Sequence, residues 1–200
     1  MSTAPLVLLL AAAILVSVAP RTVSAKAGPQ GDEQAIYALL LNEVYLADLH
    51  NVGWKQGPHD RLVIVAEPAA PGEQFEIANA LDQLGAAPDT AQSFTTARTD
   101  SLVGESIPSS VPYTLIEERE LRALFSNPDL SASWREFASR YAGSPGYVAM
   151  SGIGFNDARS EAVVYIMFSC ASLCGMGIYV RLARKKGAWA VASQTMAWVS

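Results

Sequence analysis

The stretch GYVAMSGIGFNDARSEAVVYIMFSCASLCGMGIYVRLARKKGAWAVASQTMAWVS, residues 146–200, decides the predicted fold. Its apolar residues recur with a period close to two, and turn residues at 156–159 and 185–187 divide it into extended segments. Short connections of this kind favour antiparallel pairing between strands that are neighbours in the sequence. We therefore expect a four-stranded antiparallel meander at the C-terminal end of the chain.

The segments before this stretch have mostly helical spacing. Apolar residues predict helices over 32–49 and 73–84, the second closed by Gly85, with a β-branched strand over 61–67 between them. Because the helices precede the sheet, the sequence predicts an α+β domain whose N-terminal helices pack on one face of the meander.

The middle of the chain has weaker signals. Residues 86–112 are rich in Thr, Ser and Pro and have little periodicity, so we expect a long loop there. Residues 113–125 predict an extended start that passes into a short helix. Ser133 and Glu136 have the spacing of a capping box, which predicts the start of a further helix.

The N-terminus has the pattern of an export signal. An apolar run, Leu6–Ala19, is followed by a small-x-small site ending at Ala25, so we expect a cleaved signal peptide over 1–25. As a helix this run would be about 21 Å long, shorter than a hydrocarbon core of roughly 30 Å. We expect a flexible leader over 26–31, a single domain over 32–200, a periplasmic or extracellular location and no stable membrane span after cleavage.

Cys170 and Cys174 are the only cysteines of the chain. Exported cysteines tend to be oxidised, but residues four apart in a strand are about 13 Å apart and a disulfide needs Cα atoms about 4.4–6.8 Å apart. The chain must therefore reverse between them, and we expect a disulfide that clamps a hairpin tip. Free thiols, a metal site and redox chemistry are the alternatives, although one cysteine pair lacks the four ligands of a structural zinc.

Composition and charge exclude several functions. The net charge is −5 and the basic residues are scattered, except for a cluster at the predicted hairpin tip that consists of Arg181, Arg184, Lys185 and Lys186. We therefore expect no nucleic-acid partner, because such a surface needs a broader basic patch. A metal site or histidine-dependent triad would have to use His50 or His59, whose surroundings match no common site. We expect no bound metal and no cofactor.

Two classes of function remain. The first is a non-catalytic exported domain that binds a protein partner or assists an envelope process. Its candidate contact surface consists of Tyr179, Trp189, Trp198 and the long loop over 86–112. These aromatic side chains could instead pack helices onto the sheet, which we expect more for Trp198 than for Trp189. The second class is a small-ligand binder or an enzyme, with Glu43 and Asp48 at a cavity between helices and sheet. A deep pocket with convergent polar groups would favour the second class.

Residues 151–200 also contain a recognisable succession of short motifs: a Gly-Phe-Asn turn, an Ala-Val-Val-Tyr strand, a Leu-Cys-Gly-x-Gly hairpin and a closing Gly-x-Trp…Trp-x-Ser. In this pattern the chain resembles a group of exported bacterial proteins for which no activity is known. The resemblance implies export and a shared α+β domain. The order of helices and meander also resembles cystatin-like and NTF2-like folds, a likeness of fold that implies no function.

Overall fold

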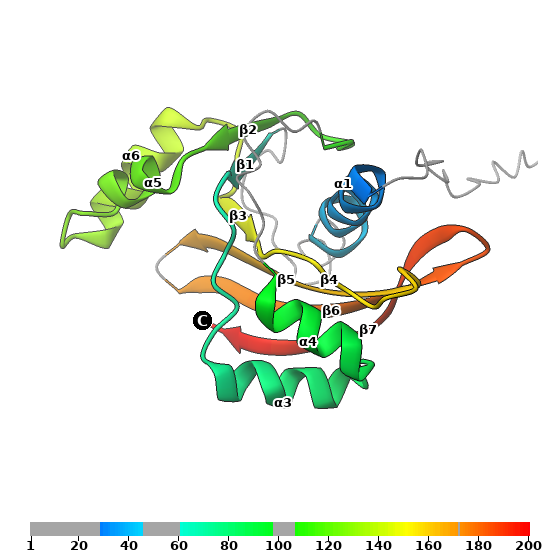
Figure 1. Ribbon diagram of the computed structural model, residues 1–200. Coiled ribbons are helices and arrows are strands. Elements are labelled where there is room, and N and C mark those ends of the chain that lie inside the picture. Colours follow the sequence, from blue (N-terminus) through cyan, green and yellow to red (C-terminus); the bar gives the residue numbers. More distant parts are fainter. Residues whose placement is uncertain (1–28, 46–60, 98–106, 172) are drawn as a thin grey trace, which may run out of the picture.

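The computed structural model describes residues 29–45, 61–97, 107–171 and 173–200 (Figure 1). Its helices are α1 (Pro29–Leu39), continued by the π-helix η1 (Leu40–Tyr45), then α3 (Gln74–Leu84), α4 (Pro88–Thr96), α5 (Glu118–Leu124) and α6 (Leu130–Arg140). Its strands are β1 (Leu62–Val65), β2 (Tyr113–Ile116), β3 (Tyr147–Met150), β4 (Gly154–Phe155), β5 (Glu161–Ala171), β6 (Cys174–Lys185) and β7 (Ala188–Val199). The predicted signal peptide, residues 1–25, lies outside the described residues. The predicted leader is wrong for residues 29–31, which belong to α1.

The α+β class is confirmed, but the four-stranded antiparallel meander is wrong as a description of the sheet. Seven strands form one mixed sheet in the order β2-β1-β3-β5-β6-β7, with β4 beside β5. β1 pairs in parallel with both β2 and β3, whereas the pairs from β3 to β7 are antiparallel. All four residues of β1 are buried, which is typical of a strand covered on both faces and explains its place inside the sheet.

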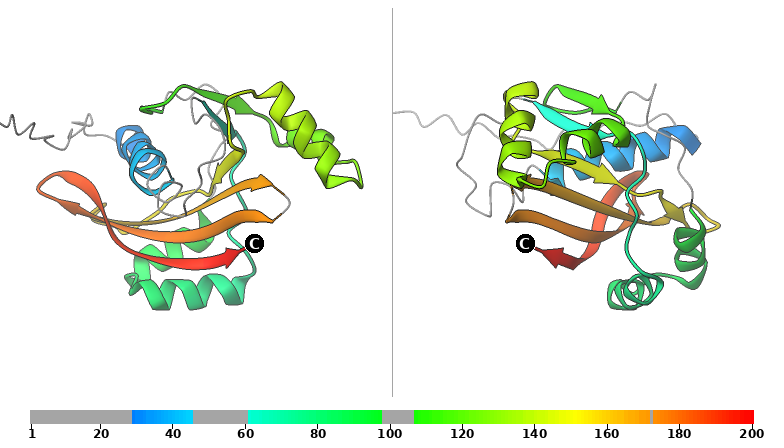
Figure 2. Two further views of the ribbon diagram at one scale, coloured as in Figure 1. Left: turned by 180° about the vertical axis from the view of Figure 1, so that it is seen from behind. Right: turned by 90° about the vertical axis from the view of Figure 1, so that its left-hand side faces the viewer.

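Helices cover both faces of the sheet, not one face as the sequence predicts. α1 and η1 lie on one side of the long strands, and α3 and α4 lie on the other (Figure 2). Consecutive residues of β5, Val163 and Val164, are both fully buried and belong to different core clusters. Because neighbouring residues of a strand point to opposite faces, each face needs its own apolar cover.

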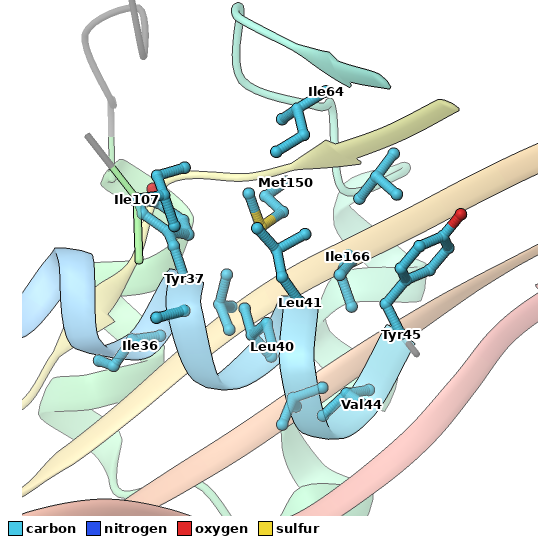
Figure 3. Packing of buried hydrophobic residues seen from close by; sticks show 14 of the residues in the cluster. Ile36, Tyr37, Leu40, Leu41, Val44, Tyr45, Ile64, Ile107, Met150 and Ile166 are labelled. Carbon is cyan, nitrogen blue, oxygen red and sulfur yellow. The ribbon is translucent and has the colours of Figure 1, made fainter. Parts of the chain in front are cut away.

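The face under α1 holds the largest core cluster (Figure 3). Leu40 and Leu41 of η1 are both inaccessible and pack with Ile64, Met150 and Ile166 from three strands. The predicted helix over 32–49 is therefore present as α1 and η1 up to residue 45, and residues 46–49 lie outside the described range.

On the opposite face, α6 contributes aromatic side chains to a cluster in which Trp134 stacks on Tyr147 with ring centroids 6.0 Å apart. The predicted capping box is wrong, because α6 begins one turn earlier. Asp129 is its N-cap and accepts a hydrogen bond from the Ser131 N–H at 2.9 Å. Asp is a strong N-cap residue, so Ser133 instead lies buried inside the helix.

The long loop predicted over 86–112 is also wrong in its first part, because residues 88–96 form α4. Pro88 and Asp89 occupy the first turn, where both residue types are favoured. The apolar signal of this helix is weak, since only Thr90 and Phe94 are buried. Residues 98–106 of the predicted loop lie outside the described residues.

The disulfide between Cys170 and Cys174 is confirmed, with Cα atoms 5.2 Å apart at the tip between β5 and β6. Replacing Cys170 with Ser should lower the free energy of unfolding by about 2 kcal/mol, the amount expected for so short a closed loop. Urea unfolding followed by tryptophan fluorescence measures this change, with the reduced wild-type chain as the control. A Cys170→Ser chain that is unfolded without urea would contradict a purely local clamp.

Candidate functional site

The two ends of the sheet differ in how their edges are protected. The edge strand β2 has only four residues and lies between Pro112 and Glu117. The edge strand β7 has 12 residues, AWAVASQTMAWV, without a proline or a charged side chain. Natural sheets usually protect their edges with short strands, charges or prolines. By these criteria β7 is the unprotected edge, and Figure 2 shows it as the outermost long strand.

Two irregularities shape this edge. Trp198 pairs with Gly177 and Met196 with Ile178, so Ala197 has no partner on β6. The same shift recurs where Ser193 pairs with Arg181 and Val191 with Leu182, which leaves Ala192 unpaired. Each bulge bends and twists the strand without ending the ladder.

Apolar side chains are exposed at the C-terminal end of β7. The exposed fractions are 58% for Met196, 37% for Trp198 and 65% for Val199. Leu173, at the tip of the β5–β6 hairpin, is 85% exposed. Among the described residues, no strand pairs with the outer side of β7, so this end of the edge combines an unpaired strand side with apolar surface that a partner can cover.

The backbone of β7 is held in place by side chains on the α3 face. The Ser193 hydroxyl donates to the Leu84 carbonyl at 3.1 Å, and the Thr195 hydroxyl donates to Gln83 Oε1 at 2.6 Å. Near the end of the strand, the Trp198 indole N–H donates to the Tyr165 hydroxyl at 2.8 Å. The strand is thus fixed before any partner arrives.

Gly177 makes the contact between Tyr165 and Trp198 possible, because an added Cβ would overlap both the hydroxyl and the indole nitrogen. Beside it, the Tyr179 hydroxyl donates to the Pro71 carbonyl. Burial raises the pKa of Tyr179 to about 12 and also raises the pKa of Tyr165. Both hydroxyls stay protonated at neutral pH, so this group of side chains anchors the strand and supplies no general base.

The predicted contact surface is wrong for two of its three aromatic residues. Tyr179 is 1% exposed and Trp189 is 8% exposed, so only Trp198 reaches the surface. The Trp189 ring packs in the core cluster under α1, and its indole N–H donates to Asp32 Oδ1 of α1 at 3.2 Å. The expectation that Trp198 packs more than Trp189 is therefore reversed.

Asp32 contacts side chains from two other parts of the fold. Its carboxylate is buried and pairs with Arg159 at 3.2 Å and with Arg184. Arg184 also lies over the Trp189 ring, 4.9 Å from its centroid. These contacts tie α1 to the two hairpins. The sequence analysis named Arg184 and Trp189 but did not predict that either contacts Asp32.

The predicted polar pocket is not assembled by the described residues. Glu43 is exposed on η1, and Asp48, like His50 and His59, lies outside the described range. A cleft of about 190 Å³ lies instead where β1 and β3 end, lined by Pro68, Ala69, Pro71, Phe94, Ala97, Ser151 and Gly152. The Ser151 hydroxyl is already bonded to the Tyr165 N–H and the Gly152 carbonyl. With no charged side chain among these lining residues, the cleft lacks the convergent polar groups of a typical ligand site.

No protein-family model, curated protein or solved structure matches this chain. Within the described ranges, none of the helices is both long and apolar enough to cross a membrane. Because the cleft lacks convergent polar groups and β7 is an uncharged edge strand, we infer a function from the edge of β7.

Proposed function

We propose that this chain is an exported, non-catalytic binding domain whose β7 edge accepts an extended strand from a protein partner. The observation that carries the proposal is the 12-residue edge without charge or proline. In strand addition, the main-chain hydrogen bonds supply affinity, and alternate side chains supply specificity.

Two further features support binding at this edge. The hydrogen bonds of Ser193, Thr195 and Trp198 hold β7 in place, so little conformational entropy is lost when a second strand pairs with it. The exposed side chains of Met196 and Val199 add apolar area that an incoming strand would remove from water.

Export is the second part of the proposal. It is supported by the apolar N-terminal segment that ends at Ala25 and by the Cys170–Cys174 disulfide. Disulfides persist in oxidising compartments and are rare in the cytosol. Strand addition at β7 would then take place in the periplasm or the medium.

Site-specific photo-crosslinking tests the proposal. Benzoylphenylalanine is placed at Gln194 or at Met196, both exposed on β7, and at Ser139, exposed on α6, as the matched control. After irradiation of cells that produce the chain, the crosslinker at position 194 or 196 should form adducts with another polypeptide, and the crosslinker at position 139 should form none. The two adducts should map to one short partner segment, at positions about two residues apart, because paired strands advance in step. Equal yields at Ser139, or adducts scattered over the partner, would contradict strand addition.

A further inference from the structure

We infer that the strand accepted by β7 is β7 of a second copy of this chain, paired antiparallel about a two-fold axis at Gln194. This inference rests on the proposed function and names the partner of that same edge. It follows from the charge, the side-chain sizes and the register of β7, each of which is compatible with self-pairing.

The charge of β7 permits self-pairing. Like charges that face each other across two strands destabilise the pair, and edge charges are a common means of preventing self-association. In an antiparallel pair of identical strands, the residue on the two-fold axis faces its own copy, and a charge close to the axis lies near the same charge of the partner strand. β7 has no charged residue at any of its 12 positions.

The side-chain sizes along β7 are also self-complementary. The first half of the strand contains the small residues Ala188, Ala190 and Ala192, which alternate with Val191 and with Trp189, a buried side chain. The second half contains the large exposed residues Met196, Trp198 and Val199. Antiparallel self-pairing about Gln194 sets the second half of each strand beside the first half of the other. The large Trp198 then meets the small Ala190, and Met196 meets Val191. An isologous interface requires this kind of complementarity within one surface.

The register defines which face each residue of β7 occupies. Three residues of β6, Val180, Ile178 and Leu182, belong to the core cluster under α1. They pair with Gln194, Met196 and Val191 in that order, so these three residues of β7 lie on the α1 face. The alternate residues of β6 are Arg181, Tyr179 and Gly177. They pair with Ser193, Thr195 and Trp198 in that order, so these three residues of β7 lie on the α3 face.

With a two-fold axis at Gln194, and with Ala192 and Ala197 left out of the ladder as bulges, residues of the two strands that face each other lie on the same face of the sheet. Thr195 then meets the partner's Ser193 on the α3 face, and Met196 meets the partner's Val191 on the α1 face. Trp198 meets the partner's Ala190. The bulges thus keep side chains of the same face together in both halves of the pair, and the two sheets become one continuous sheet.

A charge-swap experiment at Gln194 tests the inference by sedimentation equilibrium of the chain purified from the exported fraction. The wild type should sediment as a dimer, and Gln194→Ala should remain dimeric. Gln194→Lys and Gln194→Glu should each weaken the dimer about tenfold, because like charges meet at the axis. An equimolar mixture of the Lys and Glu variants should restore the wild-type affinity. A monomeric wild type, or a Lys variant as dimeric as the wild type, would overturn the inference.

Two controls make the outcome unambiguous. Near-UV circular dichroism should be the same for all variants, which separates dissociation from unfolding. A monomeric chain whose Gln194 crosslinks to a different polypeptide would overturn the second copy as the partner and leave strand addition standing. A monomeric chain without any adduct at β7 would overturn both.

Discussion

Replacing Asp32 with Ala is expected to lower the free energy of unfolding by about 3 kcal/mol. The Asp32 side chain is 7% exposed and its carboxylate pairs with both Arg159 and Arg184. Removing one partner of a buried ion pair leaves the other charges without compensation, which is the costly case. The expected loss lies at the low end of that class, because both guanidinium groups are partly exposed and can regain water. Urea unfolding followed by tryptophan fluorescence measures it.

The matched control for this substitution is Asp82→Ala, which removes an exposed carboxylate from α3. Its effect should stay within about 0.5 kcal/mol, as is usual for surface positions. Asp32→Asn should fall between the two, because the amide keeps a hydrogen-bond acceptor for the Trp189 indole but loses the charge. Equal stabilities for the Asp32→Ala and Asp82→Ala chains would mean that the carboxylate does not hold α1 in place.

Gly154→Ala is expected to be destabilising by about 3 kcal/mol and to displace α4. A Cβ on Gly154 would overlap the backbone N and Cα of Phe94 in α4. Backbone atoms of a helix cannot turn aside as a flexible side chain does, so either the helix or β4 must move. Hydrogen exchange followed by mass spectrometry should show faster exchange in α4, and urea unfolding should give the loss of stability.

Gly175→Ala is the matched control for Gly154→Ala. The nearest atoms to its added Cβ are the Phe168 carbonyl oxygen at 2.9 Å and the Trp198 ring at 3.1 Å. The contact with the backbone oxygen is longer than the contacts that Gly154→Ala would impose on the Phe94 backbone, and the Trp198 ring is partly exposed on the edge strand and can shift. A smaller loss is expected, without faster exchange in α4. If Gly154→Ala behaved like Gly175→Ala, the close approach of β4 to α4 would not be a constraint on the fold.

The features predicted correctly from the sequence are those that depend on neighbouring residues. The helix over 73–84 ends as predicted at Gly85, which has a φ of 63° and caps it. The last three strands follow from their alternating pattern and from the turn at 185–187, where Lys186 and Gly187 have positive φ. The Cys170–Cys174 disulfide follows from the hairpin that brings the two cysteines together.

The features that the sequence analysis missed depend on contacts between distant residues. The parallel pairing of β1 with β2 joins Leu62 to Tyr113, and no local pattern specifies such a partner. The burial of Trp189 depends on Asp32, which lies 157 positions away. The uncharged edge of β7 was visible in the sequence, but it gained meaning only when the strand order placed β7 outside.

The contacts of Asp32 also bear on the order in which the chain can fold. A ribosome releases the polypeptide from its N-terminus, so α1 is available long before its partners. Arg159, Arg184 and Trp189 follow Asp32 by 127, 152 and 157 residues. The hairpins of β5, β6 and β7 need only local contacts and form quickly once they are released, whereas long-range contacts carry a larger entropic cost. The contacts of the first helix with Arg159, Arg184 and Trp189 therefore form after the hairpins, and they close the core late in folding.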